Sequence, residues 1–143
     1  MKLTIQFTTR FLAKVKKTLS EQEIDDIGSW PDCNVFFQDG DNKVEVRPDI
    51  CFSWFQHVIS YLSYHDSYYE DIWGIPIYMK FNGGSFVIFE KNKALKEIFH
   101  SEISKDDLIS LFNKSLVSAV HQLEEINPAL KKSSIWNNYT TIF

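Results

Sequence analysis

The sequence predicts an α+β fold: a mainly antiparallel sheet of about five strands, with two main helices and one short helix packed on one face. Two pairs of β-prone segments flank short turns, and a helix-forming segment follows each pair. Hairpins that alternate with helices form antiparallel sheets covered by helices. The chain has 143 residues, a usual size for one domain, so we expect residues 1–143 to form a single domain.

The first segment alternates between apolar and polar side chains. From Leu3 to Val15 the odd-numbered positions are apolar apart from Thr9, and the even-numbered positions are polar apart from Leu12. A period of two residues buries one face of a strand and exposes the other. We therefore expect residues 1–17 to form one long strand, or two collinear strands, with a basic solvent face.

A short acidic helix is expected next. Ser20 and Glu23 have the spacing of a capping box, which marks the start of a helix. Gly28 is typical of a residue that ends a helix. The following Trp30-Pro31-Asp32 reads as a turn.

Two hairpins are expected around short loops rich in Asp, Asn and Gly. The first joins residues 34–38 to residues 43–47, and the second joins residues 74–81 to residues 85–90. Their loops are Asp39-Gly40-Asp41-Asn42 and Asn82-Gly83-Gly84. Loops of this composition between β-prone runs are typical of β-hairpins.

A longer helix is expected after each hairpin. The first begins near Pro48 and has apolar residues at helical spacing, namely Phe55, Val58, Ile59 and Leu62. The second begins at the Ser104–Asp107 cap and ends near Asn127-Pro128. Its apolar stripe is Leu108, Ile109, Phe112, Leu116, Ala119, Val120 and Leu123.

The last segment, residues 133–143, is unusually apolar for the end of a chain. It contains Ile135, Trp136, Tyr139, Ile142 and Phe143. We expect this tail to dock on its own domain, and the alternative is that it docks on a partner. A homodimer or structural subunit that uses the tail is therefore one of the functional alternatives.

Charge is strongly segregated along the chain. The net charge is −4, but residues 1–18 carry +5, residues 19–73 carry −10 and residues 74–143 carry +1. The acidic stretch also holds 11 of the 22 aromatic residues. A clustered negative charge attracts basic partners and raises their association rate. Two alternatives remain: the basic first strand neutralises the acidic helix, or the acids lie on solvated loops.

The densest acidic and aromatic segment runs from Tyr61 to Trp73. Tyrosine offers a large contact area with few rotatable bonds, and nearby carboxylates can bind Arg or Lys. The candidate partner-binding residues are Asp39, Asp41, Tyr64, Asp66, Tyr68, Tyr69, Glu70 and Asp71.

No catalytic or metal-binding motif emerges. His65, Asp66, Glu70 and Asp71 could meet around a metal ion, but acids are so common here that the pattern has no specificity. Cys51 and His57 are six residues apart and do not share a helix face, which argues against a nucleophilic cysteine. We expect no enzyme, no cofactor and no metal.

Composition narrows the partners and the location. A pI of about 5.5 argues against direct nucleic-acid binding. The sequence has neither an apolar signal segment near Met1 nor a membrane-spanning run, so we expect a cytoplasmic protein without membrane contact. Cys33 and Cys51 are expected to be two reduced thiols, the alternative being one structural disulfide.

The layout resembles that of small bacterial α+β immunity proteins from polymorphic toxin systems. The resemblance lies in the hairpin loop at residues 39–42, the acidic tyrosine segment Tyr64–Asp71, and Ser85–Glu90 followed by the Ser104–Asp107 cap and a long final helix. It implies a protein that binds and inhibits a cognate toxin stoichiometrically, without catalysis. It assigns a role to no individual residue.

The hypothesis is therefore a small bacterial binding protein that occludes a basic partner, such as a cognate toxin, through an acidic, tyrosine-rich surface. A ligand-binding domain or enzyme with a pocket between sheet and helices is the main alternative. That alternative predicts a pocket lined by His57 or His65 with converging carboxylates.

Overall fold

The fold is α+β and contains two antiparallel sheets. The computed structural model describes residues 1–30, 33–46, 50–65, 67–69, 77–91 and 94–140. The N-terminal sheet has the strand order β1 (Lys2–Phe7), β2 (Cys33–Asp39), β3 (Asn42–Glu45). The central sheet has the order β4 (Ser67–Tyr69), β5 (Ile77–Asn82), β6 (Ser85–Glu90), β7 (Lys96–Ser101).

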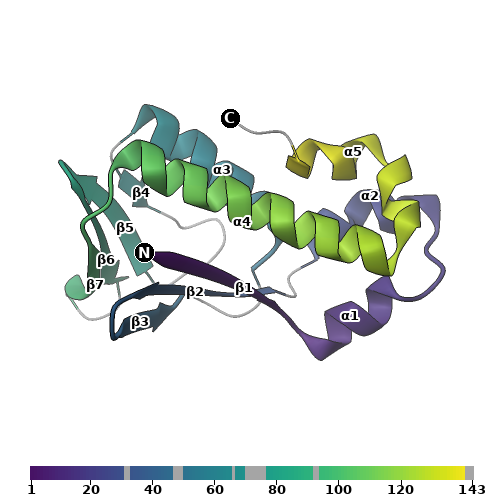
Figure 1. Ribbon diagram of the computed structural model, residues 1–143, viewed down its shortest axis with the longest axis horizontal. Helices are drawn as coiled ribbons and strands as arrows, with labels where there is room; N and C mark the ends of the chain where they lie inside the picture. The colour runs from purple at the N-terminus through teal and green to yellow at the C-terminus, as the bar shows by residue number, and fades with distance from the viewer. Residues whose placement is uncertain (31–32, 47–49, 66, 70–76, 92–93, 141–143) are drawn as a thin grey trace.

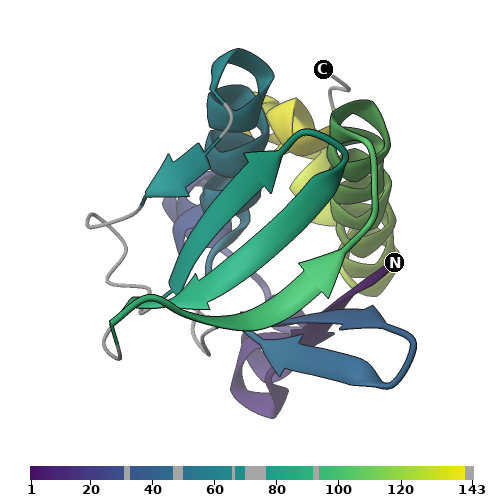
Figure 2. The same ribbon diagram turned by 90° about the vertical axis from the view of Figure 1, so that its left-hand side faces the viewer.

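The α+β class is thus confirmed, but the single sheet of about five strands is wrong. Strands β3 and β7 lie next to each other without forming a ladder, so the strands divide into two sheets (Figure 2). Strand β7 was not expected, because the turn before it has no glycine: Ala94 and Leu95 have φ values of 55° and 54°. Non-glycine residues seldom adopt such values, and their sequence therefore carries no turn signal.

The expected long first strand is right for Lys2–Phe7 and wrong for the residues that follow. Residues Thr9–Val15 form helix α1, in which the Thr8 hydroxyl oxygen accepts a hydrogen bond from the N–H of Phe11 at 3.1 Å. Phe11 and Val15 are fully buried. Because they are four residues apart, their burial suits a helix as well as an alternating strand, so alternation alone could not distinguish the two.

The expected short helix is α2 (Glu21–Asp26). Its capping box is confirmed: Glu23 N–H donates to the Ser20 hydroxyl at 3.1 Å, and Ser20 N–H donates to the Glu23 carboxylate at 3.0 Å. Gly28 does not end the helix in the left-handed conformation. It lies within a 3₁₀ turn, η1 (Ile27–Ser29), that continues from α2. Of the expected turn after it, residues 31–32 lie outside the described residues.

Both expected hairpins are present. Asp39 pairs with Asn42 across the first turn, and Asn82 pairs with Ser85 across the second. Gly40 and Gly83 have φ values of 60° and 65°, which glycine adopts without steric cost. The parts of the expected strands at residues 47 and 74–76 lie outside the described residues.

Both expected long helices are also present, as α3 (Phe52–Tyr64) and α4 (Lys105–Ile126), and they pack against each other. The expected start of the first near Pro48 is wrong: α3 begins after Cys51, because Ile50 pairs with Cys33 in an extended bridge. Figure 2 shows both behind one face of the central sheet, while Figure 1 shows α4 running alongside β1. The Phe37 ring of β2 joins the layers, because its centroid lies 5.6 Å from Phe86, 6.1 Å from Phe99 and 5.8 Å from Phe112. One hydrophobic core therefore connects both sheets with α4.

The chain after α4 returns to α2 and α3. It forms η3 (Pro128–Lys132), α5 (Ser134–Asn137) and η4 (Asn138–Thr140), and residues 141–143 lie outside the described residues. Trp136 is fully buried, with its ring 5.5 Å from Phe52. The Ser133 hydroxyl donates to Asp25 at 2.9 Å. The aromatic side chains of Trp136 and Tyr139 are therefore part of the core rather than of the surface.

Candidate functional site

The outer face of α3 is the most aromatic exposed surface among the described residues. The inner face buries Phe52, Trp54, Phe55, Val58, Ile59 and Leu62 against the core. The helical period then turns His57, Tyr61 and Tyr64 outward, and His65 follows as the C-terminal cap residue. Tyr64 is 84% exposed and Tyr61 is 37% exposed. We call His57, Tyr61, Tyr64 and His65 the α3 aromatic face.

Three rings of the α3 aromatic face form a row along the helix. The Tyr61 ring centroid lies 6.3 Å from that of His57 and 4.3 Å from that of His65. The spacing of four residues places successive rings over one another. The backbone N–H of His65 donates to the carbonyl oxygen of Tyr61 at 2.9 Å, which completes the last turn of α3. The three rings therefore form one exposed row on the surface of α3.

Of the predicted residues in the tyrosine segment, the structure describes Tyr64, Tyr68 and Tyr69. Tyr64 is exposed, as described above. Tyr68 and Tyr69 lie in β4, where they pair with Met79 and Tyr78 of β5. Asp66, Glu70 and Asp71 lie outside the described residues.

The predicted hairpin residues lie elsewhere. Asp41 is exposed at the tip of the β2–β3 turn, and Asp39 beside it is partly exposed. A carboxylate oxygen of Asp39 lies 3.9 Å from the amino group of Met1. Strands β5, β6 and β7 separate this hairpin from β4, so the two groups occupy opposite sides of the molecule in Figure 2. The structure does not bring all eight predicted residues into one surface.

The described acids of the acidic stretch are likewise dispersed in space. Helix α2 exposes Glu21, Glu23 and Asp26 at one end of the molecule, whereas the β2–β3 hairpin lies toward the other end (Figure 1). The acids that the structure describes on α2 and on the hairpin therefore do not form one patch.

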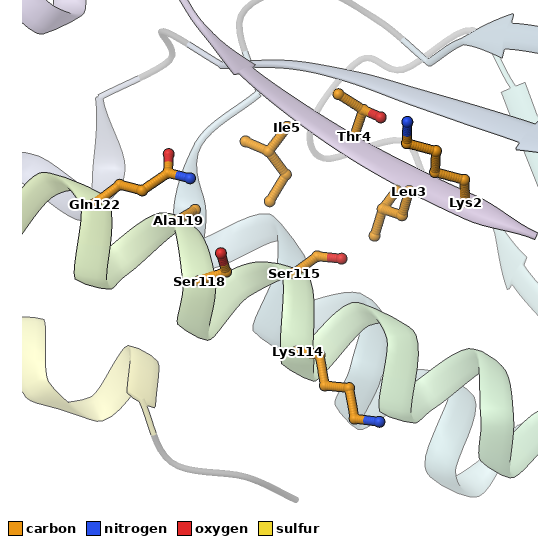
Figure 3. A pocket seen from close by; sticks show the side chains of 9 residues that line it. All are labelled: Lys2, Leu3, Thr4, Ile5, Lys114, Ser115, Ser118, Ala119 and Gln122. Carbon is orange, nitrogen blue, oxygen red and sulfur yellow. The ribbon is translucent and has the colours of Figure 1, made fainter.

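A groove between β1 and α4 is a second candidate, which the sequence did not reveal. Figure 3 shows β1 crossing the helix, with Leu3 and Ile5 directed toward it. The groove has a volume of about 370 Å³. Its polar lining comes from Lys2 and Thr4 on the strand and from Lys114, Ser115, Ser118 and Gln122 on the helix. The sequence features that contribute to this groove are the basic N-terminal segment and the small polar residues of the long helix.

This groove lies between a sheet and a helix, but its lining differs from the pocket that the ligand-binding alternative describes. Neither His57 nor His65 lines it, and no carboxylate does. Its two charged groups are both ammonium groups. Its chemistry suits an anionic ligand or an acidic segment.

In the described part of the chain, no group of three or more His, Cys, Asp or Glu side chains could hold a metal ion. His57 and His65 are eight residues apart, or about 12 Å along the helix axis, too far for one ion. No described helix combines the length and the apolar character that a membrane span requires.

Cys33 and Cys51 lie on neighbouring segments of the chain and do not form a disulfide. Cys33 pairs with Ile50 through two backbone hydrogen bonds of 3.0 and 2.8 Å, and Cys51 is the next residue. Both cysteine side chains are buried. The Cys51 sulfur lies 3.1 Å from the Ser53 hydroxyl.

Comparisons of the chain with protein-family models, with curated proteins and with solved structures gave no match.

Proposed function

We propose that the chain is a protein-binding protein that engages a basic partner through the α3 aromatic face and the adjoining strand β4. The observation that supports this most directly is the 84% exposure of Tyr64, on the same helix as the row of His57, Tyr61 and His65 rings. Large aromatic side chains at protein surfaces are the residues most enriched at the energetic centres of interfaces.

The order of the row favours tight binding. A tyrosine side chain has only two rotatable torsions to freeze, and the stacking of Tyr61 on His65 restricts these rings further. A surface that is ordered beforehand loses less conformational entropy on association. Binding at this face would therefore be tighter than binding through the same aromatic side chains on a mobile loop.

Charge would select the partner. Asp66 precedes β4 directly, and Glu70 and Asp71 follow it directly, so three acids lie within two residues of this strand in the sequence. Their carboxylates would pair with Lys and Arg of a basic partner and would steer its approach. The proposed surface omits Asp39 and Asp41, because the hairpin that carries them lies on another side of the molecule.

The mechanism we propose is occlusion of a basic cleft in the partner, as in an inhibitor of the immunity type. Binding would be stoichiometric, and the chain would supply no catalytic group. The resemblance in layout and the composition of this surface support the proposal together.

The test is co-expression with each basic protein encoded in neighbouring genes, followed by purification and measurement of the mass and dissociation constant of any complex. Tyr64→Ala and the triple change Asp66→Lys, Glu70→Lys and Asp71→Lys should each weaken the complex by about tenfold or more. The matched control, Glu21→Lys with Glu23→Lys and Asp26→Lys, makes the same change of charge on α2. If it weakens the complex as much as the first triple variant, the binding surface is not the one proposed.

A further inference from the structure

Strand β1 is the outer strand of the N-terminal sheet. It pairs with β2 along Lys2–Phe7, and no described strand pairs with its other edge. An antiparallel strand at a sheet edge directs about half of its backbone N–H and C=O groups outward, where they can pair with another strand. The groove between β1 and α4 follows this strand from Lys2 to Ile5.

Each wall of this groove carries one lysine. Lys2 comes from β1 and Lys114 comes from α4, and both are exposed. Neither ammonium group forms an ion pair with another described residue. The remaining polar lining consists of hydroxyl and amide groups, which can accept or donate hydrogen bonds. The two ammonium groups lie at the rim, one on the side of β1 away from the helix and one on the side of α4 away from the strand (Figure 3), and no carboxylate lines the groove.

We propose that β1 binds an extended, acidic segment of a partner protein as an additional strand at its outer edge. The backbone of the segment would pair with β1, and its carboxylates would reach Lys2 and Lys114. Ser115, Ser118 and Gln122 would contact side chains that alternate toward α4. This mode of binding takes its affinity from main-chain hydrogen bonds and its specificity from the groove beside the strand.

A second copy of this chain fits the edge less well. If two β1 strands paired across a twofold axis, each copy would bring Lys2 and Lys114 to the same interface. Like charges placed together at an interface oppose association. The charge of the groove therefore favours an acidic partner over self-pairing. This inference concerns a surface other than the α3 aromatic face, so each can fail without the other.

The experiment uses a displayed library of random twelve-residue peptides, selected on the full chain. We expect the enriched peptides to be acidic and to alternate acidic or polar residues with β-branched residues. One enriched peptide is then synthesised with a fluorophore, and its affinity is measured by anisotropy at low and high salt. Hydrogen exchange should show protection of the β1 amides when the peptide is bound. Enrichment of basic peptides, or of peptides without an acidic excess, would overturn the proposal.

Three variants locate the peptide. The pair Lys2→Glu and Lys114→Glu should weaken binding by about tenfold or more, and Ser118→Trp, which fills the groove from α4, should do the same. Lys131→Glu changes the charge at an exposed residue outside the groove and should leave affinity within about twofold. Equal loss in Lys131→Glu, or unchanged protection of β1, contradicts the assignment. Circular dichroism on each variant confirms that it is folded, and a concentration-dependent dimer through β1 would also overturn the proposal.

Discussion

The ring of Tyr139 fills the space beside Gly28 that any larger side chain would need for its Cβ atom. Gly28 is buried in η1, and Tyr139 is in η4, 111 residues later. The φ of Gly28 is not positive, so the residue is required here by close packing rather than by its backbone conformation. The contact holds the last described segment against the turn that follows α2.

Replacing Gly28 by alanine should displace this ring. We expect Gly28→Ala to lower the free energy of unfolding by roughly 1–3 kcal/mol, because overpacking a buried site forces the ring or the backbone to move. Urea unfolding of Gly28→Ala, Tyr139→Ala and the double variant measures the coupling between the two positions. In the Tyr139→Ala background the alanine should be nearly neutral. An undiminished cost there would show that the ring is not the obstacle.

Tyr139 should make stability sensitive to alkaline pH. Burial raises the pKa of the Tyr139 phenol above its ordinary value of 10.0, and the nearby Cys51 thiol raises it further. Above pH 10 the unfolded phenol therefore ionises first, while the folded phenol keeps its proton. The contribution of this residue to stability is thus intact below pH 10 and declines as the pH rises through the folded pKa. Unfolding free energies measured between pH 9 and about pH 11 should fall more steeply for the wild type than for Tyr139→Phe.

Asn127 links the end of α4 to the end of α1. Its side-chain oxygen accepts from the N–H of Ala129 at 3.1 Å, and its side-chain nitrogen donates to the carbonyl oxygens of Val15 at 2.8 Å and Lys17 at 3.2 Å. Asn127→Ala should cost about 1–3 kcal/mol, because it removes these bonds and leaves partly buried groups without partners. Asn127→Asp keeps the side-chain oxygen that accepts from Ala129 but loses the nitrogen that donates to Val15 and Lys17. It therefore measures the contribution of the two donated bonds separately from that of the helix cap. An aspartate variant as stable as the wild type would mean that the link contributes nothing.

Tyr64 should matter for binding and hardly at all for folding. The residue is exposed, and we expect Tyr64→Ser to change the free energy of unfolding by less than about 0.5 kcal/mol. Thermal and urea unfolding both check this. A large loss of stability would assign Tyr64 a structural role and would undermine its use as a probe of the proposed interface.

The two cysteine thiols should react only when the structure opens. Cys33 is fully buried and Cys51 is 2% exposed. A thiol reagent should therefore modify the folded protein at least about a thousandfold more slowly than the unfolded protein, since access requires local or global unfolding. The reaction rate should rise with urea in parallel with the fraction unfolded. Rapid modification without denaturant would show that one of the thiols has access to solvent.

Much of the secondary structure could be predicted because its signals are local. The Ser20–Glu23 capping box acts within one helical turn, and Gly40 and Gly83 specify their hairpin turns through their own φ angles. Strand β7 follows a turn without glycine and was missed for that reason. Helix α1 was mistaken for strand because the burial of Phe11 and Val15 satisfies both periods.

The candidate site was predictable only in part. The exposure of Tyr64 follows from the helical period, since the buried stripe of α3 passes through Phe55, Val58, Ile59 and Leu62 on its other side. That Asp41 lies far from Tyr64 could not be predicted, because strand order separates them. The groove of Lys2 and Lys114 joins residues that are 112 positions apart, and no sequence spacing relates them.

The sequence by itself determined the α+β class, the capped helices, the two hairpins and the division of charge along the chain. These depend on neighbours in the chain, whose interactions operate over a few residues. Long-range packing decides that the strands form two sheets and that the Tyr139 ring occupies the space beside Gly28. It also places the described acids of α2 and of the β2–β3 hairpin apart, and it brings Lys2 and Lys114 to the two walls of one groove. Those outcomes depend on packing between distant segments, where the burial of shared apolar surface, and not local preference, selects which elements become neighbours.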